Sequence, residues 1–467
     1  MLFFIGDTQG KLGEIMLSIV ILAAGKGTRM NSGLPKVLQP LSGKPLLEHV
    51  VRTARLLHPK EIIIVHGYAG DTVKAHFTEK DIKWAQQKEQ LGTGHAVMQA
   101  TDIISNDNSV LVLYGDVPLV SANILELLIS EHKKGEIDLL TTTLPSAEGY
   151  GRILRCNGNV QAIIEEAETN KTEKQINEIN TGIMYCEAKP LKKWLSRLEN
   201  NNSKNEYYLT DVIDMATKEG VKVKGLKAEK WEELMGINDK KELAQAERNL
   251  QQKLTDELMQ NGVTLIDPAR VDIRGSLKCG KDVVIDVNNI FEGDVILDDN
   301  VSIGPNNYIN NSQINNGSVV HANSHIDGAL IGKNSTVGPY ARLRPGAKLQ
   351  DNVKIGNFVE IKKSTISDNS KVNHLSYIGD TEIGSFVNVG AGTITCNYDG
   401  ANKHKTEIKD GAFIGSGVEL VAPVVIGENA TVGAGSTISK SAPEKTLTVE
   451  RAEQVTVDNW KRPKKKS

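Results

Sequence analysis

Apolar residues follow two different spacings along the chain. From about residue 17 to residue 237, short apolar runs of strand length alternate with stretches in which apolar residues recur every three or four positions. That alternation is typical of an α/β domain whose mostly parallel sheet is covered by helices on both faces. The expected strands include residues 61–66, 110–114, 139–143 and 183–186, and the expected helices include residues 46–57 and 122–134.

Residues 239–261 have a helical spacing only. We expect one amphipathic linker helix within residues 238–262, because apolar residues recur every three or four positions among charges. The pair Asn261-Gly262 is a good stop signal for that helix. The apolar positions are Leu243, Ala246, Leu250, Leu254 and Leu258.

After residue 270 the spacing becomes six. An aliphatic residue recurs at every sixth position, and occasional steps of five shift the phase without ending the repeat. A hexad repeat of this kind predicts a parallel β-helix in which three hexads form each triangular turn of about 18 residues, and residues 273–440 would give roughly nine turns. The repeat positions include Ile273, Cys279, Ile285, Phe291, Leu297, Ile303, Ile309, Val337, Leu343, Leu349, Ile355, Ile361, Ile408, Ile414, Leu420, Ile426, Val432 and Ile438.

The hexad repeat has one gap. Between Thr395 and Ile408 the step is 13 residues, and the intervening segment CNYDGANKHKTE is polar. A polar excursion from a rigid solenoid is either a tolerated surface loop or part of a site. The residues alone leave both interpretations open.

A glycine-rich segment follows the first apolar run. Gly25 and Gly27 come directly after the expected strand and lead to Arg29 and Lys36. Glycines in this place allow the backbone to approach a phosphate chain, which its N–H groups and two cations can hold. The alternative is a tight turn that serves packing alone.

Asp116 ends the apolar run VLVLYGD. A carboxylate at the tip of a strand, facing phosphates, is a natural ligand for Mg²⁺. The alternative is that Asp116 caps the helix that follows.

Composition limits the classes of function. The chain has 467 residues, enough for two or three domains, and a net charge of −3, which gives no general attraction to nucleic acid or anionic membranes. No apolar run is long enough to span a bilayer, so no membrane insertion is expected. The four cysteines, Cys156, Cys186, Cys279 and Cys396, form no CxxC pair, which fits reduced thiols in the cytoplasm.

The two ends of the chain are assigned no chemistry. Residues 1–16 do not have the pattern of an export signal, and their role stays unknown. The basic tail Lys461, Arg462 and 464–466 is expected to be a solvated terminus and not a nucleic-acid patch.

Two cations mark a second candidate site in the solenoid. Arg344 and Lys362 each follow a repeat position directly, and they lie 18 residues apart, or one turn. They should therefore stack on adjacent coils about 5 Å apart, the spacing of neighbouring strands. Either an anion such as a phosphate lies between them, or the side chains splay apart into solvent.

These segments together resemble the family of bacterial bifunctional N-acetylglucosamine-1-phosphate uridylyltransferases/glucosamine-1-phosphate N-acetyltransferases. The resemblance extends over about residues 17–463, and its most specific strings are LAAGKGTRM, EQLGTGHA, YGDVPL, GYGRI, EINTG, ARLRPGA, HLSYIGD and GAGTITCNYDGANK. It implies a Rossmann-like nucleotidylyltransferase domain at 17–237, a linker helix at 238–262 and a left-handed β-helix acetyltransferase domain at 263–467, which includes the basic tail.

The resemblance implies that the first domain joins UTP and N-acetylglucosamine-1-phosphate with release of pyrophosphate. The attacking phosphate oxygen is already an anion, so catalysis needs positioning and charge neutralisation, not a base. Arg29 and Lys36 would act on the triphosphate, and Asp116 and Asn238 would hold Mg²⁺. Gln87, Gly92 and Thr93 would contact the uracil, and the sugar would contact Tyr114, Gly151, Glu165 and Asn180. The other nucleotide and sugar contacts would come from Leu22, Ala23, Ala24, Gly25, Gly27, Lys36, Gly115, Asp116 and Asn238.

The resemblance implies that the second domain acetylates glucosamine-1-phosphate with acetyl-CoA. The amine must lose a proton as it attacks, and a histidine titrates in the right range; His374 in HLSYIGD is the expected general base. We expect direct transfer without an acyl-Cys396 intermediate. The phosphate of glucosamine-1-phosphate would contact Arg344, Lys362 and Lys403, and its sugar would contact Tyr377 and Asn388. Asn397 and Tyr398 would line the cleft, and acetyl-CoA would contact Ala391, Ser416, Ala434 and Arg451.

The family also implies a cytoplasmic homotrimer, because the acetyltransferase cleft is built between neighbouring solenoids. Its product, UDP-N-acetylglucosamine, would supply peptidoglycan and lipopolysaccharide synthesis. Two rival hypotheses remain at this point. In one, the solenoid is a structural or regulatory module, as in ADP-glucose or GDP-mannose pyrophosphorylases; in the other, the chain is a non-catalytic assembly subunit.

Overall fold

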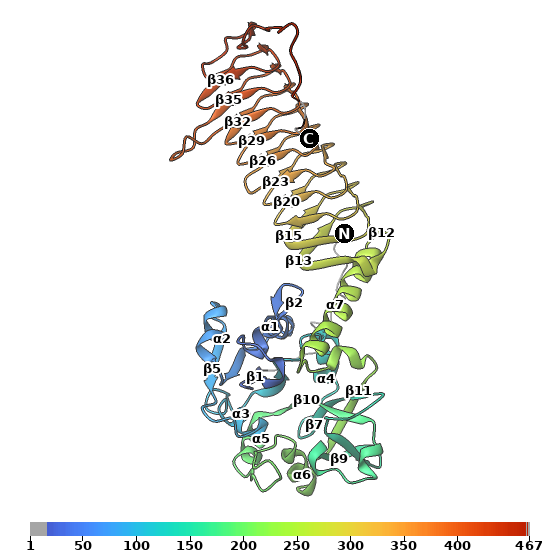
Figure 1. Ribbon diagram of the computed structural model, residues 1–467. Coiled ribbons are helices and arrows are strands. Elements are labelled where there is room, and N and C mark those ends of the chain that lie inside the picture. The colour runs from blue at the N-terminus through green and yellow to red at the C-terminus, as the bar shows by residue number, and fades with distance from the viewer. Residues whose placement is uncertain (1–15, 464, 466–467) are drawn as a thin grey trace. The chain divides into compact units, whose positions relative to one another are not determined.

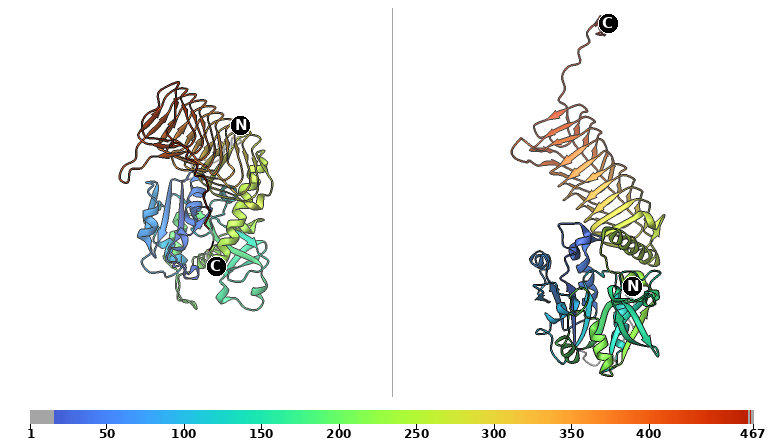
Figure 2. Two further views of the ribbon diagram at one scale, coloured as in Figure 1. Left: turned by 45° about the horizontal axis from the view of Figure 1, so that its top comes forward. Right: turned by 60° about the horizontal axis from the view of Figure 1, so that its bottom comes forward.

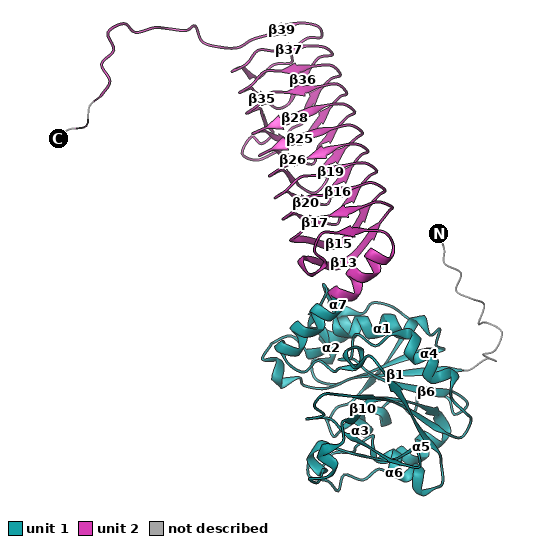
Figure 3. Ribbon diagram, turned by 90° about the vertical axis from the view of Figure 1, so that its right-hand side faces the viewer, with its two compact units in different colours: residues 1–250 teal, residues 251–467 magenta. Residues whose placement is uncertain are grey.

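The computed structural model describes residues 16–463 and residue 465 (Figure 1). Most of the N-terminal extension and part of the basic tail that the sequence analysis described lie outside these residues. They are residues 1–15, Lys464 and Lys466. The chain divides into two compact units, Met1–Leu250 and Gln251–Ser467, which Figure 3 colours separately. Each unit is described by itself.

A twisted sheet forms the centre of unit 1, with strand order β11-β7-β10-β6-β1-β4-β5. β1 pairs in parallel with β4 and β6, whereas β10 runs antiparallel to both β6 and β7. The expected α/β class is confirmed, with one antiparallel strand in the middle of the sheet. The strands are β1 (Leu17–Ala23), β4 (Glu61–His66), β5 (Ile82–Gln86), β6 (Ser109–Tyr114), β7 (Ile137–Thr143), β10 (Glu178–Glu187) and β11 (Val223–Ala228), and the hairpin of β8 (Arg152–Cys156) and β9 (Asn159–Ile164) pairs with β10.

Helices cover both faces of this sheet, as Figure 2 also shows. On one face Val20, Ile63 and Val112 pack with α3, α5 and α6; on the other face Ile19 and Leu111 pack with α1 and α4. All seven residues of β1 are buried, because the strand is covered on both sides. The helices are α1 (Leu46–Leu56), α2 (Gly70–His76), α3 (Thr93–Met98), α4 (Ala122–Ser130), α5 (Ala188–Leu195) and α6 (Asp211–Lys218).

α4 ends four residues before the expected end at 134. Its C-terminal cap is Glu131, and the segment after it turns toward β7. The sequence analysis extended the helix to residue 134 because Lys133 and Lys134 are good helix formers. In the structure these two lysines belong instead to the segment that leads into the turn at Gly135, whose φ is +85°.

α7 (Lys240–Gln260) is the long helix expected between the two patterns. Leu243, Ala246 and Leu250 belong to an apolar cluster of unit 1, and Leu254 and Leu258 pack on the core of unit 2. The helix ends before Gly262, whose φ of +91° is the left-handed conformation expected for a C-terminal stop.

Unit 2 is the predicted left-handed parallel β-helix (Figure 1). Its short strands, from β12 (Thr264–Leu265) to β39 (Leu447–Thr448), form two long parallel sheets of 11 and 17 strands. Residues 17 or 18 positions apart lie side by side, as Leu343 does with Ile361 and Ile361 with Ile378. The hexad positions fill one continuous core, and Cys279 is the member of the sequence-derived repeat that stays partly exposed.

The predicted gap is a self-supported loop between β32 (Ile394–Cys396) and β33 (Thr406–Ile408). Tyr398 and Lys403 form an antiparallel bridge across it. The Asp399 carboxylate accepts the N–H groups of Ala401 and Asn402 at 2.8 and 2.6 Å and lies 2.6 Å from the His404 ring. These contacts lower the pKa of Asp399, and they give the loop a defined shape.

No helix in the described part of the chain is long and apolar enough to cross a membrane.

Candidate active sites

Unit 1 contains a cavity of about 350 Å³ at the carboxyl ends of β1 and β6. This is the edge at which an open α/β sheet binds its ligands. Thirteen of the residues expected from the sequence line the cavity, and Thr28, Val37, Gln90, Ala96 and Glu206 line it in addition. The thirteen are Leu22, Ala23, Ala24, Gly25, Gly27, Arg29, Lys36, Gln87, Gly92, Thr93, Tyr114, Asp116 and Asn238.

The glycine-rich turn brings Lys36 close to the backbone. Gly27 has φ +60°, and a Cβ on it would lie 2.4 Å from the Cβ of Lys36. Any side chain at residue 27 would therefore displace Lys36 in addition to straining the backbone. Gly25 has open space around it, which leaves its backbone accessible from the cavity.

Four polar side chains converge on one side of the cavity. The Lys36 ammonium forms an ion pair with the Asp116 carboxylate and donates a hydrogen bond to Asn238 Oδ1 at 2.8 Å. Arg29 Nη2 donates to the same oxygen at 2.9 Å. The Asp116 carboxylate and the Asn238 oxygen thus face cationic groups that compete for them.

Asp116 is not the cap of the following helix, because Ser121 occupies the N-cap position of α4. A carboxylate and an amide oxygen are ligands that Mg²⁺ accepts, together with phosphate oxygens and water. Within residues 16–463 and 465, no group of three acidic, histidine or cysteine side chains could hold a metal by itself. The oxygen pair fits a cation that is shared with a bound triphosphate.

The lining of the cavity also includes the residues expected at the uracil. Gln87, which is 3% exposed, donates to the carbonyl of Gly92 at 3.0 Å. Gly92 has φ +108°, and a Cβ there would meet the Tyr207 carbonyl oxygen at 2.5 Å. Thr93 Oγ1 accepts the N–H of Leu209 at 3.1 Å. These contacts fix this part of the lining before any ligand binds.

The residues expected at the sugar form a neighbouring cluster. Asn180 donates its backbone N–H to the carbonyl of Gly151 at 2.9 Å, and Thr210 donates to Glu165 at 2.8 Å. Burial, with Glu165 and Asp116 nearby, raises the pKa of Tyr114. Gly115, Gly151, Glu165 and Asn180 are not among the residues that line the 350 Å³ cavity.

Asp211 belongs to this cluster and was missed by the sequence analysis. Burial raises its pKa to about 6, and the carboxylates of Glu165 and Asp214 add to the effect. A string such as NEYYLTD contains its position but gives no sign that the carboxyl group is partly buried.

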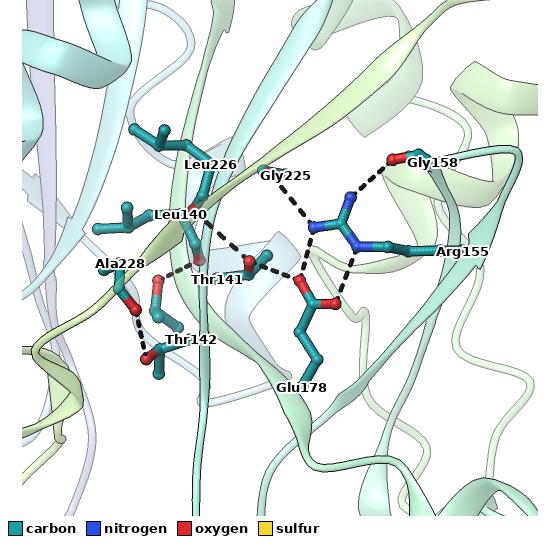
Figure 4. A network of polar contacts seen from close by, with 10 residues as sticks. Leu140, Thr141, Thr142, Arg155, Gly158, Glu178, Gly225, Leu226 and Ala228 are labelled. Atoms are coloured by element: carbon teal, nitrogen blue, oxygen red, sulfur yellow. Dashed lines mark hydrogen bonds and ion pairs between the residues drawn. The ribbon is translucent and has the colours of Figure 1, made fainter.

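A polar network supports the start of β10 (Figure 4). The Arg155 guanidinium donates to both oxygens of Glu178, at 2.8 and 2.6 Å, and to the carbonyl of Gly225 at 3.1 Å. Thr141 donates to Glu178 as well, at 2.7 Å. The network joins β7, β8, β10 and β11 two residues before Asn180, so it fixes the strand that carries this residue.

In unit 2 the expected pair of cations lies on adjacent coils, at the ends of β23 (Arg342–Leu343) and β26 (Glu360–Lys362). Arg344 donates to Glu360 Oε1 at 2.8 Å, a partner that the sequence analysis did not foresee. The neighbouring Lys403 side chain lowers the pKa of Lys362, and the charge of Arg344 contributes to the same effect. Lys403 reaches this point from the excursion loop.

His374 lies at the end of β28 (Lys371–His374), exposed to solvent. Its Nδ1 lies 3.0 Å from Asn357 Oδ1, on the preceding coil of the same sheet. Asn388 follows one coil later, where it pairs with Lys371. Tyr377 pairs with Glu360 and belongs to β29 (Tyr377–Gly379).

The excursion loop contributes two further expected residues. Asn397 donates to Asp380 at 2.5 Å, and Tyr398 donates its hydroxyl to the carbonyl of Gly400 at 2.6 Å. Tyr398 is 60% exposed, so it is available to a ligand or to another chain. Burial and Glu419 raise the pKa of the Cys396 thiol, which disfavours the thiolate needed by an acyl-cysteine route.

The residues expected at acetyl-CoA follow one another along the solenoid axis. Gly417 donates to the Ala391 carbonyl at 2.7 Å, and Gly435 donates to the Ser416 carbonyl at 2.9 Å. Ala434 and Arg451 belong to the later coils of this column, where Arg451 Cδ lies 3.7 Å from the Cβ position of Gly435. Small side chains leave this edge of the coils open.

Comparisons with known proteins agree with this division. Residues 19–177 match the MobA-like NTP transferase domain family, and residues 328–363 and 405–440 match the bacterial transferase hexapeptide family. The chain is 53% identical to the bifunctional protein GlmU of Ralstonia pickettii, over 96% of this chain and 99% of the relative. It is 52% identical to the bifunctional protein GlmU of Acinetobacter baumannii, over the same shares of the two chains.

Proposed function

The chain belongs to the GlmU family of bifunctional uridylyltransferases and acetyltransferases, and from this membership we propose which residues carry the two activities. It is a bifunctional enzyme, with the nucleotidyltransferase in unit 1 and the hexapeptide acyltransferase in unit 2. The two rival hypotheses, a structural solenoid and a non-catalytic subunit, are therefore not retained.

In unit 2 we propose N-acetylation of glucosamine-1-phosphate by acetyl-CoA. The sugar phosphate would lie against Arg344, Lys362 and Lys403, whose positive charges otherwise repel one another. The amine nitrogen would attack the thioester carbon and give its proton to Nε2 of His374, and the bond to the CoA sulfur would break. Nδ1 of His374 is held by Asn357, which supports this assignment of the free nitrogen.

In unit 1 we propose uridylyl transfer to N-acetylglucosamine-1-phosphate. An oxygen of the sugar phosphate would attack the α-phosphorus of UTP, and pyrophosphate would leave. Lys36 and Arg29 would neutralise the crowded phosphates, and the turn at Gly25 and Gly27 would bring backbone N–H groups to them. Gln87, Gly92 and Thr93 would contact uracil, and the cluster around Asn180 would contact the sugar.

Asp116 and Asn238 would hold Mg²⁺, which would supply charge neutralisation at the phosphates. The observation that carries this proposal is the convergence of Lys36 and Arg29 on the oxygens of these two residues. Oxygens that attract two cationic side chains within one cavity are suited to a divalent cation. The side chains of Lys36 and Arg29 would then be released to contact the bound triphosphate.

We also propose a cytoplasmic homotrimer in which neighbouring solenoids complete each acetyltransferase cleft. Its support is the open edge of small residues and the exposed loop around Tyr398. Sedimentation of the full chain at equilibrium would test the state, and a monomer at micromolar concentration would contradict it.

The pair of activities is tested by omission. The full chain receives acetyl-CoA, glucosamine-1-phosphate, UTP and Mg²⁺, and free CoA thiol and pyrophosphate are measured in parallel. We expect CoA release without UTP, whereas pyrophosphate release from glucosamine-1-phosphate should require acetyl-CoA. Failure of CoA release would remove the acetyl-transfer proposal, and failure of pyrophosphate release from added N-acetylglucosamine-1-phosphate would remove the uridylyl-transfer proposal.

A further inference from the structure

The backbone of Asn238 is hydrogen-bonded to a side chain in the first turn of α7. Glu242, in this turn, accepts the backbone N–H of Asn238 at 2.6 Å through Oε2. Glu242 donates its own N–H to Oδ1 of Asp239 at 2.8 Å. The two bonds resemble a capping box, in which an acidic or polar cap and a glutamate one turn later satisfy each other's backbone donors.

The arrangement differs from the usual capping box in one respect. The usual third-position glutamate accepts the N–H of the cap residue itself, which here is Asp239. Glu242 instead accepts the N–H of the residue before the cap, and that residue is Asn238. The carboxylate therefore acts on a residue that faces the cavity, not only on the end of the helix.

Asn238 is fixed on its other sides as well. Its Nδ2 donates to the carbonyl of Gly236 at 3.2 Å, and its Oδ1 consequently faces Lys36 and Arg29. Ile237, the residue before it, donates its N–H to the carbonyl of Asp116 at 2.9 Å. A Cβ on Gly236 would lie 3.9 Å from both carboxylate oxygens of Asp116 and 4.0 Å from Asn238 Nδ2, so the two side chains meet at one point.

We propose that Glu242 is a positioning residue for uridylyl transfer, whose carboxylate holds the backbone of Asn238 so that Oδ1 faces the divalent cation beside Asp116. The inference rests on the proposed function, because it requires Asn238 to be a ligand. It adds to that function a residue of the linker helix that holds one of the two proposed metal ligands in place. Without the carboxylate, the backbone N–H of Asn238 loses its acceptor. The side chain of Asn238 keeps its bonds to Gly236, Lys36 and Arg29, but the bond that fixes its backbone is gone.

A second route by which Glu242 could act is its charge. The Glu242 carboxylate is close enough to contribute, after burial, to raising the pKa of Tyr150 to about 12, together with Asp116. A negative charge near the site would attract a cation without holding Asn238. Glu242→Gln separates the two routes, because glutamine keeps an oxygen acceptor for the N–H and removes the charge.

The test measures binding of UTP to the full chain by calorimetry, without sugar phosphate, once in saturating Mg²⁺ and once in EDTA. The ratio of the two dissociation constants is the gain in affinity that the metal provides. For Glu242→Ala we expect this gain to fall roughly 10-fold, the low end of the effect of losing a residue that orients a metal ligand. Glu242→Gln should keep the gain within about threefold, since its acceptor survives.

Two further variants complete the design. Glu257→Ala removes an exposed glutamate from the last part of the same helix and should leave the gain unchanged. Asp116→Ala should abolish the gain, and if the wild-type chain itself showed no gain, the metal assignment would fail and the positioning role with it. All variants are compared well below their melting midpoints, so that loss of the helix cap does not enter the measurement.

Two results would overturn the inference while leaving the proposed function intact. An undiminished gain in Glu242→Ala would show that Asn238 is held without the carboxylate. A gain in Glu242→Gln as low as in Glu242→Ala would show that charge, not the hydrogen bond, is responsible.

Discussion

Nδ1 of His374 lies 3.0 Å from Oδ1 of Asn357, which occupies the paired position on the preceding coil of the β-helix. An amide oxygen only accepts hydrogen bonds, so Nδ1 carries the proton and Nε2 has the free lone pair. The solenoid thus sets the tautomer of the expected base through a residue 17 positions earlier in the chain.

Replacing the expected base should separate the two activities. His374→Ala is expected to lower kcat of acetyl transfer by roughly 10²- to 10⁴-fold, the usual contribution of a general base. Uridylyl transfer should be unchanged, because its residues belong to unit 1. Both rates are measured on one preparation, and an equal loss in both would contradict the assignment.

Removing the support of His374 should have a smaller effect on the same reaction. Asn357→Ala is expected to lower kcat of acetyl transfer about 5-fold, since one hydrogen bond of roughly 1 kcal/mol no longer favours the productive tautomer and ring orientation. The KM values should change little. Asn357→Asp keeps an acceptor and adds a negative charge, so activity should return, with the acid limb of the kcat/KM profile moved to higher pH. Retention of full kcat in Asn357→Ala would exclude the role.

The converse separation is expected in unit 1. Asp116→Ala should reduce uridylyl transfer by roughly 100-fold or more, since several kcal/mol of charge stabilisation at the phosphates would be lost. CoA release from acetyl-CoA and glucosamine-1-phosphate should stay at the wild-type rate. Unchanged Mg²⁺-dependent release of pyrophosphate would remove Asp116 from the metal site.

Binding of the sugar phosphate should depend on the clustered cations. Lys362→Ala is expected to raise KM for glucosamine-1-phosphate roughly 10-fold or more, the effect of one charge-assisted hydrogen bond, with KM for acetyl-CoA little changed. Lys348→Ala, which removes an exposed lysine from another strand of the solenoid, is the matched control. Equal effects of the two substitutions would indicate general attraction and no defined phosphate site.

Asp211 should make the stability of unit 1 depend on pH. Its pKa is raised from 3.8 to about 6. The full shift would correspond to about 3 kcal/mol, and because the carboxyl group is only partly buried, solvent screening reduces the expected change in stability to a fraction of that value. The folded state binds the proton more tightly, so the stabilisation is complete below pH 4 and is lost as pH rises through about 6. Asp211→Asn should therefore be more stable than wild type at pH 7.5 and similar to it at pH 4, as urea unfolding would measure. A difference that does not vary with pH would contradict this account.

The solenoid could be predicted almost residue by residue, because every coil repeats the same environment. Ile361, for example, needs only its place in the hexad repeat to be assigned to the core. The direction of β10 could not be predicted in this way. A buried strand has the same apolar pattern whether it runs parallel or antiparallel to its neighbours, and the pairing that decides it joins residues far apart in the chain.

The site residues of the periodic solenoid could likewise be predicted from the sequence, whereas those in loops could not. Arg344 and Lys362 could be paired from their 18-residue separation, and the same reasoning applied to Arg342 and Glu360 would have found the carboxylate beside them. Gln90 and Glu206 reach the cavity of unit 1 from loops, which have no period to count. The support that Glu242 gives to Asn238 depends on which backbone N–H donates to the Glu242 carboxylate, and only the three-dimensional structure shows this.

α7 also decides how the chain can be divided for experiment. A fragment that stops at residue 237 would strip Leu243 and Ala246 from Met30, Leu41 and Leu46, and one that starts at residue 263 would uncover the apolar residues under Leu254 and Leu258. Truncations made at the ends of the helix would thus produce fragments with exposed apolar surface that are prone to aggregate. Overlapping pieces that each retain residues 240–260 should express as well-behaved proteins.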